Sequence, residues 1–150
     1  CGGPREIIAG MNKIQSQSTT STSSISMAAA VEALNGDQDF IVKHNIAFKE
    51  RRDMVVKKLN TAKGITCTTP AGAVYVYPSC LGCIGKKTSN GNIINTDEDF
   101  MTFLLESEGI AGVHGEAFGL SPYFRISYAT SNEVLKEACK RIIRACEKLN

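Results

Sequence analysis

The pattern of hydrophobic and polar positions divides the chain near residue 64. Before that point, apolar residues recur at helical spacing, and a hydroxyl-rich stretch at 15–24 predicts a loop between helices. The pattern predicts a short helix or turn at 4–14, an alanine-rich helix at 25–36 that stops at Gly36, and a long amphipathic helix within 37–60.

After residue 64, β-branched and aromatic runs alternate with glycine and proline, which is typical of strands. We expect a helix within 96–109, because Thr96 and Asp99 form a capping-box pattern and Gly109 is placed as its stop. A C-terminal helix should begin with a second capping box, Thr130 to Glu133. Four strands are predicted, at 65–69, 73–78, 110–115 and 123–129.

These elements predict a mixed α/β chain whose second half is an α+β domain. A long helix precedes it, and a mostly antiparallel sheet is packed with helices. The length of 150 residues and the hydrophobic content of 43% fit one globular domain or a little more.

Charge and hydropathy narrow the classes of partner. Seventeen basic and 15 acidic residues are interleaved along the chain and leave a net charge of +2, so we expect neither a nucleic-acid nor a membrane partner. No apolar run has the length of a membrane span, and the first ten residues lack the pattern of a signal peptide. A cytoplasmic location is therefore expected.

The cysteines favour reduced thiols over a metal or redox centre. Six cysteines are scattered through a sequence that can form a core, which is unlike the framework of a small disulfide-rich domain. Cys80 and Cys83 form a single CxxC pattern without a second pair or a nearby histidine. We expect two incidental loop thiols there and no metal site.

Arg125 is the most informative residue of the predicted strands. In an extended run, Phe124, Ile126 and Tyr128 point to one face, while Arg125 points to the other face with small and hydroxyl-bearing neighbours. A guanidinium on such a face suits a cleft that binds an anion. The alternative is an edge-strand arginine paired with a surface acid, and the strand alone does not distinguish the two.

A glycine-rich connection precedes this strand. The segment 112–119, "GVHGEAFG", contains three glycines, which allow close backbone approach or a positive φ angle. Such a loop beside Arg125 favours the ligand-binding interpretation.

With these residues in view, the sequence resembles the class I, fold-type I aminotransferases, and within them the bacterial aspartate aminotransferases. The resemblance runs along the whole chain. Its most specific motifs are "FKERRD" at 48–53, "GAVY" at 72–75, "GEAFG" at 115–119 and "FRISYATS" at 124–131.

The resemblance implies a function and a cofactor. The full protein would transfer an amino group between aspartate and 2-oxoglutarate through pyridoxal phosphate, and Arg125 would bind the α-carboxylate of the substrate. The family's Schiff-base lysine would lie upstream of residue 1, so no catalytic residue, no cofactor-binding residue and no covalently bound cofactor are expected in this stretch. We therefore expect an inactive C-terminal fragment.

The resemblance also implies domain boundaries and a homodimer. Residues 1–36 would form an edge of the large cofactor-binding domain, 37–63 the interdomain helix, and 64–150 the small C-terminal domain. Val74 and His114 depart from the family pattern, which leaves the substrate range open. The alternatives are an aminotransferase for aromatic or prephenate substrates, or a structural or dimerising module without activity.

Overall fold

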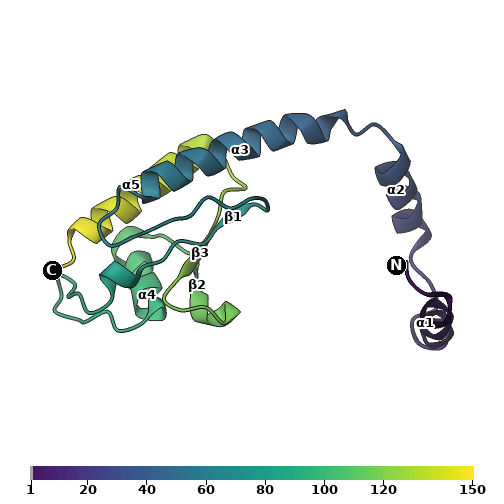
Figure 1. Cartoon of the computed structure of the whole chain (residues 1–150), viewed down its shortest axis with the longest axis horizontal. Coiled ribbons are helices and arrows are strands. Elements are labelled where there is room, and N and C mark those ends of the chain that lie inside the picture. The colour runs from purple at the N-terminus through teal and green to yellow at the C-terminus, as the bar shows by residue number, and fades with distance from the viewer. Residues whose placement is uncertain (1) are drawn as a thin grey trace. The chain divides into compact units, whose positions relative to one another are not determined.

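The structure is a computed structural model that describes residues 2–150 (Figure 1). The chain divides into two compact units, Cys1–Ile41 and Val42–Asn150. The elements are α1 (Arg5–Ser18), α2 (Ser24–Asn35), α3 (Asp39–Leu59), β1 (Tyr75–Val76), η1 (Leu81–Cys83), α4 (Asp97–Glu108), β2 (Val113–His114), η2 (Gly115–Phe118), β3 (Phe124–Ser127) and α5 (Asn132–Glu147).

In the first unit, helix α1 is longer than the sequence pattern predicts. It continues through Ser18, so the hydroxyl-rich loop expected at 15–24 is reduced to 19–23. The Ser16 hydroxyl donates to the Lys13 carbonyl at 2.9 Å, which shows how a serine is accommodated inside a helix. Helix α2 stops at Gly36 as predicted.

The second unit is an α+β domain, which confirms the predicted fold class. Its sheet has the order β1-β3-β2, and both neighbours of β3 are antiparallel to it. Figure 1 shows the three strands lying among the C-terminal half of α3, α4 and α5. One cluster of buried side chains joins these elements, with Leu59, Phe100, Phe124 and Ile142 among its members.

The expected strand at 65–69 is wrong, because only an isolated bridge between Thr66 and Ser79 forms there. The side-chain amide of Asn60 replaces the strand ladder. It donates to the Cys67 carbonyl and accepts from the Cys67 N–H, each at 2.8 Å. Since Asn60 satisfies both backbone groups, residue 67 needs no neighbouring strand.

The helix caps agree with the sequence at α4 and differ at α5. Thr96 and Asp99 form the predicted capping box, and Gly109 ends α4 with a φ of 65°. Helix α5 is capped by Ser131, whose hydroxyl accepts from the Val134 N–H at 3.3 Å. The predicted cap at Thr130 is therefore shifted by one residue.

A buried carboxylate joins α4 to α5. The Glu108 side chain is 2% exposed and forms ion pairs with Arg144 and with Lys148, the latter at 2.8 Å. Arg141 adds a hydrogen bond to the Glu108 carbonyl at 3.2 Å. The hydrogen bonds from Arg144 and Lys148 lower the pKa of Glu108 to about 2.

We expect Glu108→Gln to lower the free energy of unfolding at pH 7 by about 1 to 2 kcal/mol, because both cations lose a charged partner but are themselves half exposed. The folded-state pKa lies below the ordinary value of 4.5, so the wild-type advantage is complete above pH 4.5 and disappears as the pH falls towards 2. Urea unfolding of both chains between pH 2 and 7 measures this. A constant difference across that range would contradict the assignment.

Candidate functional site

Arg125 lies on the central strand of the sheet. Its Cα pairs with Val113 of β2, and Ser127 on the same strand pairs with Tyr75 of β1. The predicted division of faces is found, since Phe124 and Tyr128 are buried while Arg125 is half-buried on the opposite side. Within residues 2–150, Arg125 forms no ion pair, so the surface-pair alternative on an edge strand does not hold there.

Two aromatic rings contact the Arg125 guanidinium. Its Cζ lies 4.2 Å from the ring centroid of Phe118 and 4.5 Å from that of Tyr75. The face of an aromatic ring is electronegative, and each contact stabilises the cation by about 0.5 to 1 kcal/mol when partly exposed. Both rings therefore restrain the guanidinium while leaving its N–H groups available for an acceptor.

Two further tyrosines extend this aromatic face. The rings of Tyr77 and Tyr123 stack at 5.6 Å with an interplanar angle of 11°, and Tyr77 meets Phe118 edge-on at 6.3 Å. The Tyr77 hydroxyl donates to the Gly115 carbonyl at 3.0 Å, and burial raises its pKa. We call Tyr75, Tyr77, Phe118 and Tyr123 the aromatic face; with Arg125 they form a cationic site with apolar walls.

The glycine-rich connection forms a tight turn. A Cβ atom on Gly115 would lie 2.0 Å from the Leu120 carbonyl oxygen and 2.9 Å from the Tyr77 hydroxyl oxygen. Gly119 ends η2 with a φ of 75°. The Gly115 N–H also donates to the Tyr123 carbonyl at 2.7 Å, so the turn is fixed against the strand that carries Arg125.

Asp97 holds the same turn from the first residue of α4. Its side chain is fully buried, and its two oxygens accept from the Glu116 N–H at 3.0 Å and the Ser121 hydroxyl at 2.9 Å. Burial would raise the pKa of Asp97, but the hydrogen bonds from Ser121 and Glu116 outweigh burial and lower it. Both carboxylate oxygens therefore accept hydrogen bonds from the turn.

The CxxC thiols lie in the predicted loop region, and their side chains are buried in the core. Cys80 directly precedes η1, and Cys83 is the last residue of η1. Burial raises the pKa of Cys80 to about 12. Residues 2–150 contain no group of three or more histidine, cysteine or acidic side chains placed to hold a metal ion, and Cys1 lies outside the described residues.

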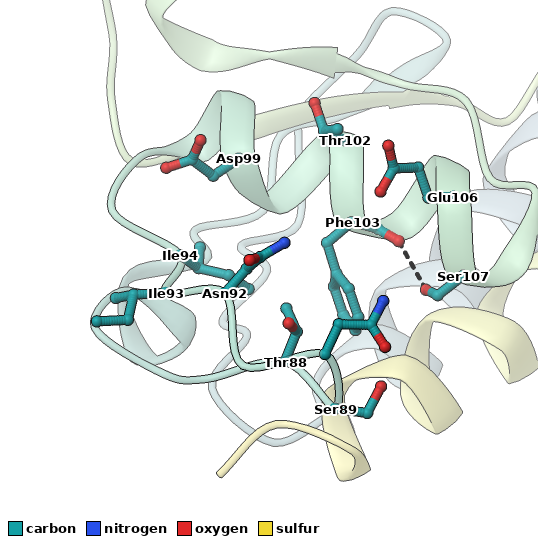
Figure 2. A pocket seen from close by; sticks show the side chains of 11 residues that line it. Thr88, Ser89, Asn92, Ile93, Ile94, Asp99, Thr102, Phe103, Glu106 and Ser107 are labelled. Atoms are coloured by element: carbon teal, nitrogen blue, oxygen red, sulfur yellow. Dashed lines mark hydrogen bonds between the residues drawn. The ribbon is translucent and has the colours of Figure 1, made fainter.

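A polar cavity of about 420 Å³ lies elsewhere in the second unit, between the loop before α4 and α4 itself (Figure 2). Phe103 forms one wall of it, and the Ser107 hydroxyl donates to the Phe103 carbonyl at 2.6 Å. No lining residue belongs to β1, β3 or η2, so this cavity is separate from the Arg125 site.

None of the eleven lysines lies in a strand or in η2, the elements that surround Arg125 in the described part of the chain. The residues around Arg125 therefore provide a cation and aromatic walls, and the strands and η2 add no lysine amine to them. No helix within 2–150 is both long and apolar enough to cross a bilayer.

Sequence reasoning identified Arg125 but missed the aromatic face and Asp97. Alternation in the predicted strand at 73–78 places Tyr75 and Tyr77 on one side, and this signal could have been used. Phe118 and Asp97 gave no such signal. The contact of Phe118 with Arg125 and the hydrogen bonds of Asp97 to the turn both depend on tertiary structure.

Comparison with protein families gives a direct match. The family model of "Aminotransferase class I and II" matches residues 1–142. The chain is 60% identical over 144 residues to a probable aspartate/prephenate aminotransferase of Rhizobium leguminosarum bv. phaseoli, covering 96% of this chain and 36% of that protein. It is 55% identical to the aspartate/prephenate aminotransferase of Cereibacter sphaeroides, covering 99% of this chain and 37% of that protein.

Solved structures agree with the sequence matches. The crystal structure of the aspartate aminotransferase from Rhizobium meliloti matches with a TM-score of 0.96 and 53% identity, covering 99% of this chain and 37% of that one. This chain thus spans a little over a third of the length of these relatives. The motifs, the family match and the structural similarity agree: the chain belongs to the class I and II aminotransferase family.

Proposed function

We propose that the chain is the C-terminal part of a pyridoxal-phosphate-dependent aminotransferase in which Arg125 binds the α-carboxylate of the substrate. One observation carries this proposal. The Arg125 guanidinium is half-buried on a central strand, lies against two aromatic rings, and has no acidic partner among residues 2–150. A guanidinium binds a carboxylate through two parallel hydrogen bonds, which fix its orientation as well as its position.

The chain contributes binding and orientation to this reaction. When bound, pyridoxal phosphate supplies the electron sink for the proton shift at the substrate α-carbon. Arg125 sets the direction of the α-carboxylate, and the aromatic face limits access of water to the guanidinium. We assign the amine that binds the cofactor covalently to the part of the full protein outside this sequence.

We keep the domain boundaries expected from the resemblance. We assign 1–36 to an edge of the large domain, 37–63 to the interdomain helix, and 64–150 to the small domain. The same resemblance supports a homodimeric full-length protein that acts in the cytoplasm.

The proposed reaction exchanges an amino group between aspartate and 2-oxoglutarate. Two of the relatives described above are named aspartate/prephenate aminotransferases, which favours prephenate as a second amino acceptor. Both acceptors are 2-oxo acids with a second carboxylate, so Arg125 would meet the same group in each.

A substrate panel on the full-length protein with pyridoxal phosphate tests this function. We expect kcat/KM for aspartate with 2-oxoglutarate to exceed that for phenylalanine by about 100-fold, because phenylalanine has no side-chain carboxylate for the second cation, which we assign to the part of the full protein outside this sequence or to its partner subunit. The Rhizobium meliloti aspartate aminotransferase serves as the positive control, and the 150-residue chain alone should show no transamination. A full-length protein that transfers no amino group from aspartate would contradict the proposal.

A further inference from the structure

The orientation of Arg125 depends on side chains from other elements. The guanidinium has no ion pair within residues 2–150, and it lies against the rings of Tyr75 and Phe118. Tyr75 belongs to a strand of the same sheet, so the ladder fixes its backbone. Phe118 ends the four-residue element η2, which has no ladder of its own.

The position of Phe118 therefore depends on what holds η2. The element is attached at its start, where the Gly115 N–H donates to Tyr123 and the Tyr77 hydroxyl donates to the Gly115 carbonyl. Phe118 itself is 50% exposed, so core packing does not fix it. A further restraint on the turn comes from a side chain outside η2.

Asp97 is that restraint. One carboxylate oxygen accepts from the N–H of Glu116, inside η2, and the other accepts from the hydroxyl of Ser121, beyond its end. The two hydrogen bonds tie both sides of the Phe118 segment to the first residue of α4. An amide at position 97 is neutral: its oxygen can accept from Glu116 and its NH2 group can only donate to Ser121, so both hydrogen bonds lose their charged acceptor and become weaker.

We propose that Asp97 is a positioning residue for Arg125, acting through η2 and the Phe118 ring to set the plane of the guanidinium. This inference rests on the proposed function, in which Arg125 binds the substrate α-carboxylate. Without Asp97 the turn loosens, Phe118 leaves the guanidinium, and the two parallel hydrogen bonds to the carboxylate form less often. Because the carboxylate is bound equally in the ground state and the transition state, the loss appears in binding rather than in kcat.

The test uses Asp97→Asn in the full-length protein loaded with pyridoxal phosphate. We expect the dissociation constant of 2-oxoglutarate, measured by calorimetry without an amino donor, to rise roughly 10-fold. KM for aspartate and for 2-oxoglutarate should rise by a similar factor, while kcat changes by less than about twofold. An unchanged dissociation constant would overturn the inference.

Two sets of variants separate positioning from general destabilisation. Glu108→Gln removes a buried carboxylate at the other end of α4 and should leave the dissociation constant of 2-oxoglutarate unchanged. Phe118→Leu should raise the dissociation constant of 2-oxoglutarate as much as Asp97→Asn does. The double variant should have the same dissociation constant as the single variants. If the dissociation constant of the double variant instead rises by the product of the two single-variant factors, Asp97 does not act through Phe118.

A milder variant keeps the test decisive if Asp97→Asn fails to fold. Ser121 is exposed, and Ser121→Ala removes one of the two hydrogen bonds that Asp97 accepts. We expect a smaller rise, of roughly threefold, in the dissociation constant of 2-oxoglutarate. Equal binding by Ser121→Ala, Phe118→Leu and the wild type would contradict the inference.

The same measurements distinguish this inference from the proposed function. A wild type that binds 2-oxoglutarate through Arg125 but does not transaminate would contradict the function and leave the positioning role intact. An active wild type whose binding is unchanged by Asp97→Asn would contradict the positioning role alone. A wild type that neither binds 2-oxoglutarate nor transaminates would overturn both.

Discussion

Replacement of Arg125 by lysine in the full-length protein is expected to raise KM for both the amino acid and the 2-oxo acid by roughly 100-fold. Lysine keeps the charge and can still lie against Phe118 and Tyr75. It cannot form two parallel hydrogen bonds with one carboxylate, and losing such a charged hydrogen bond costs about 3 kcal/mol. That free energy corresponds to a factor of roughly 100 in kcat/KM.

The effect on both substrates is the informative part, because the amino acid and the 2-oxo acid each present an α-carboxylate to Arg125. Steady-state kinetics with each substrate varied in turn measures it. Arg141→Lys is the matched control, since Arg141 lies in α5 and pairs with Glu137. Michaelis constants of Arg125→Lys that equal those of the wild type would sink the assignment of Arg125.

Gly115→Ala is expected to destabilise the folded chain by about 3 kcal/mol or more. The new methyl carbon would lie 2.0 Å from the Leu120 carbonyl oxygen and 2.8 Å from the Tyr123 carbonyl oxygen. Both neighbours are backbone atoms, so they cannot rotate away as a flexible side chain can. The turn must open, which also breaks the hydrogen bond from the Tyr77 hydroxyl to Gly115.

Gly72→Ala is the control for this prediction. A Cβ atom at position 72 meets nothing within 4 Å, and its backbone does not require glycine, so we expect a change within about 0.5 kcal/mol. Urea unfolding of the two variants and the wild type gives the comparison. A Gly115→Ala chain as stable as Gly72→Ala would show that the turn is not fixed as described.

The sequence predicts best where the determining contacts are local. The capping box of Thr96 and Asp99 lies within four residues, and its residue types alone specify the start of α4. Alternation likewise placed Phe124 in the core and Arg125 on the opposite face. Both depend on backbone geometry that a short stretch of residues determines.

Predictions failed where a distant side chain changes the backbone's partners. Nothing in the run 65–69 shows that Asn60 satisfies Cys67 from the end of α3, so the run was expected to form a strand. Asp97 is an ordinary acidic residue for a helix start, which hides its bonds to Glu116 and Ser121. The sequence therefore predicts the cation of the site, while the structure is needed for the groups that orient it.

The tyrosines of the aromatic face also give this chain an intrinsic spectroscopic signal. The chain has no tryptophan and only four tyrosines, of which Tyr75, Tyr77 and Tyr123 belong to that face. Intrinsic ultraviolet emission of the isolated chain thus arises largely from the tyrosines of this face, which contacts Arg125 through Tyr75. A change of environment around the guanidinium is readable without a dye, a label or an engineered fluorophore.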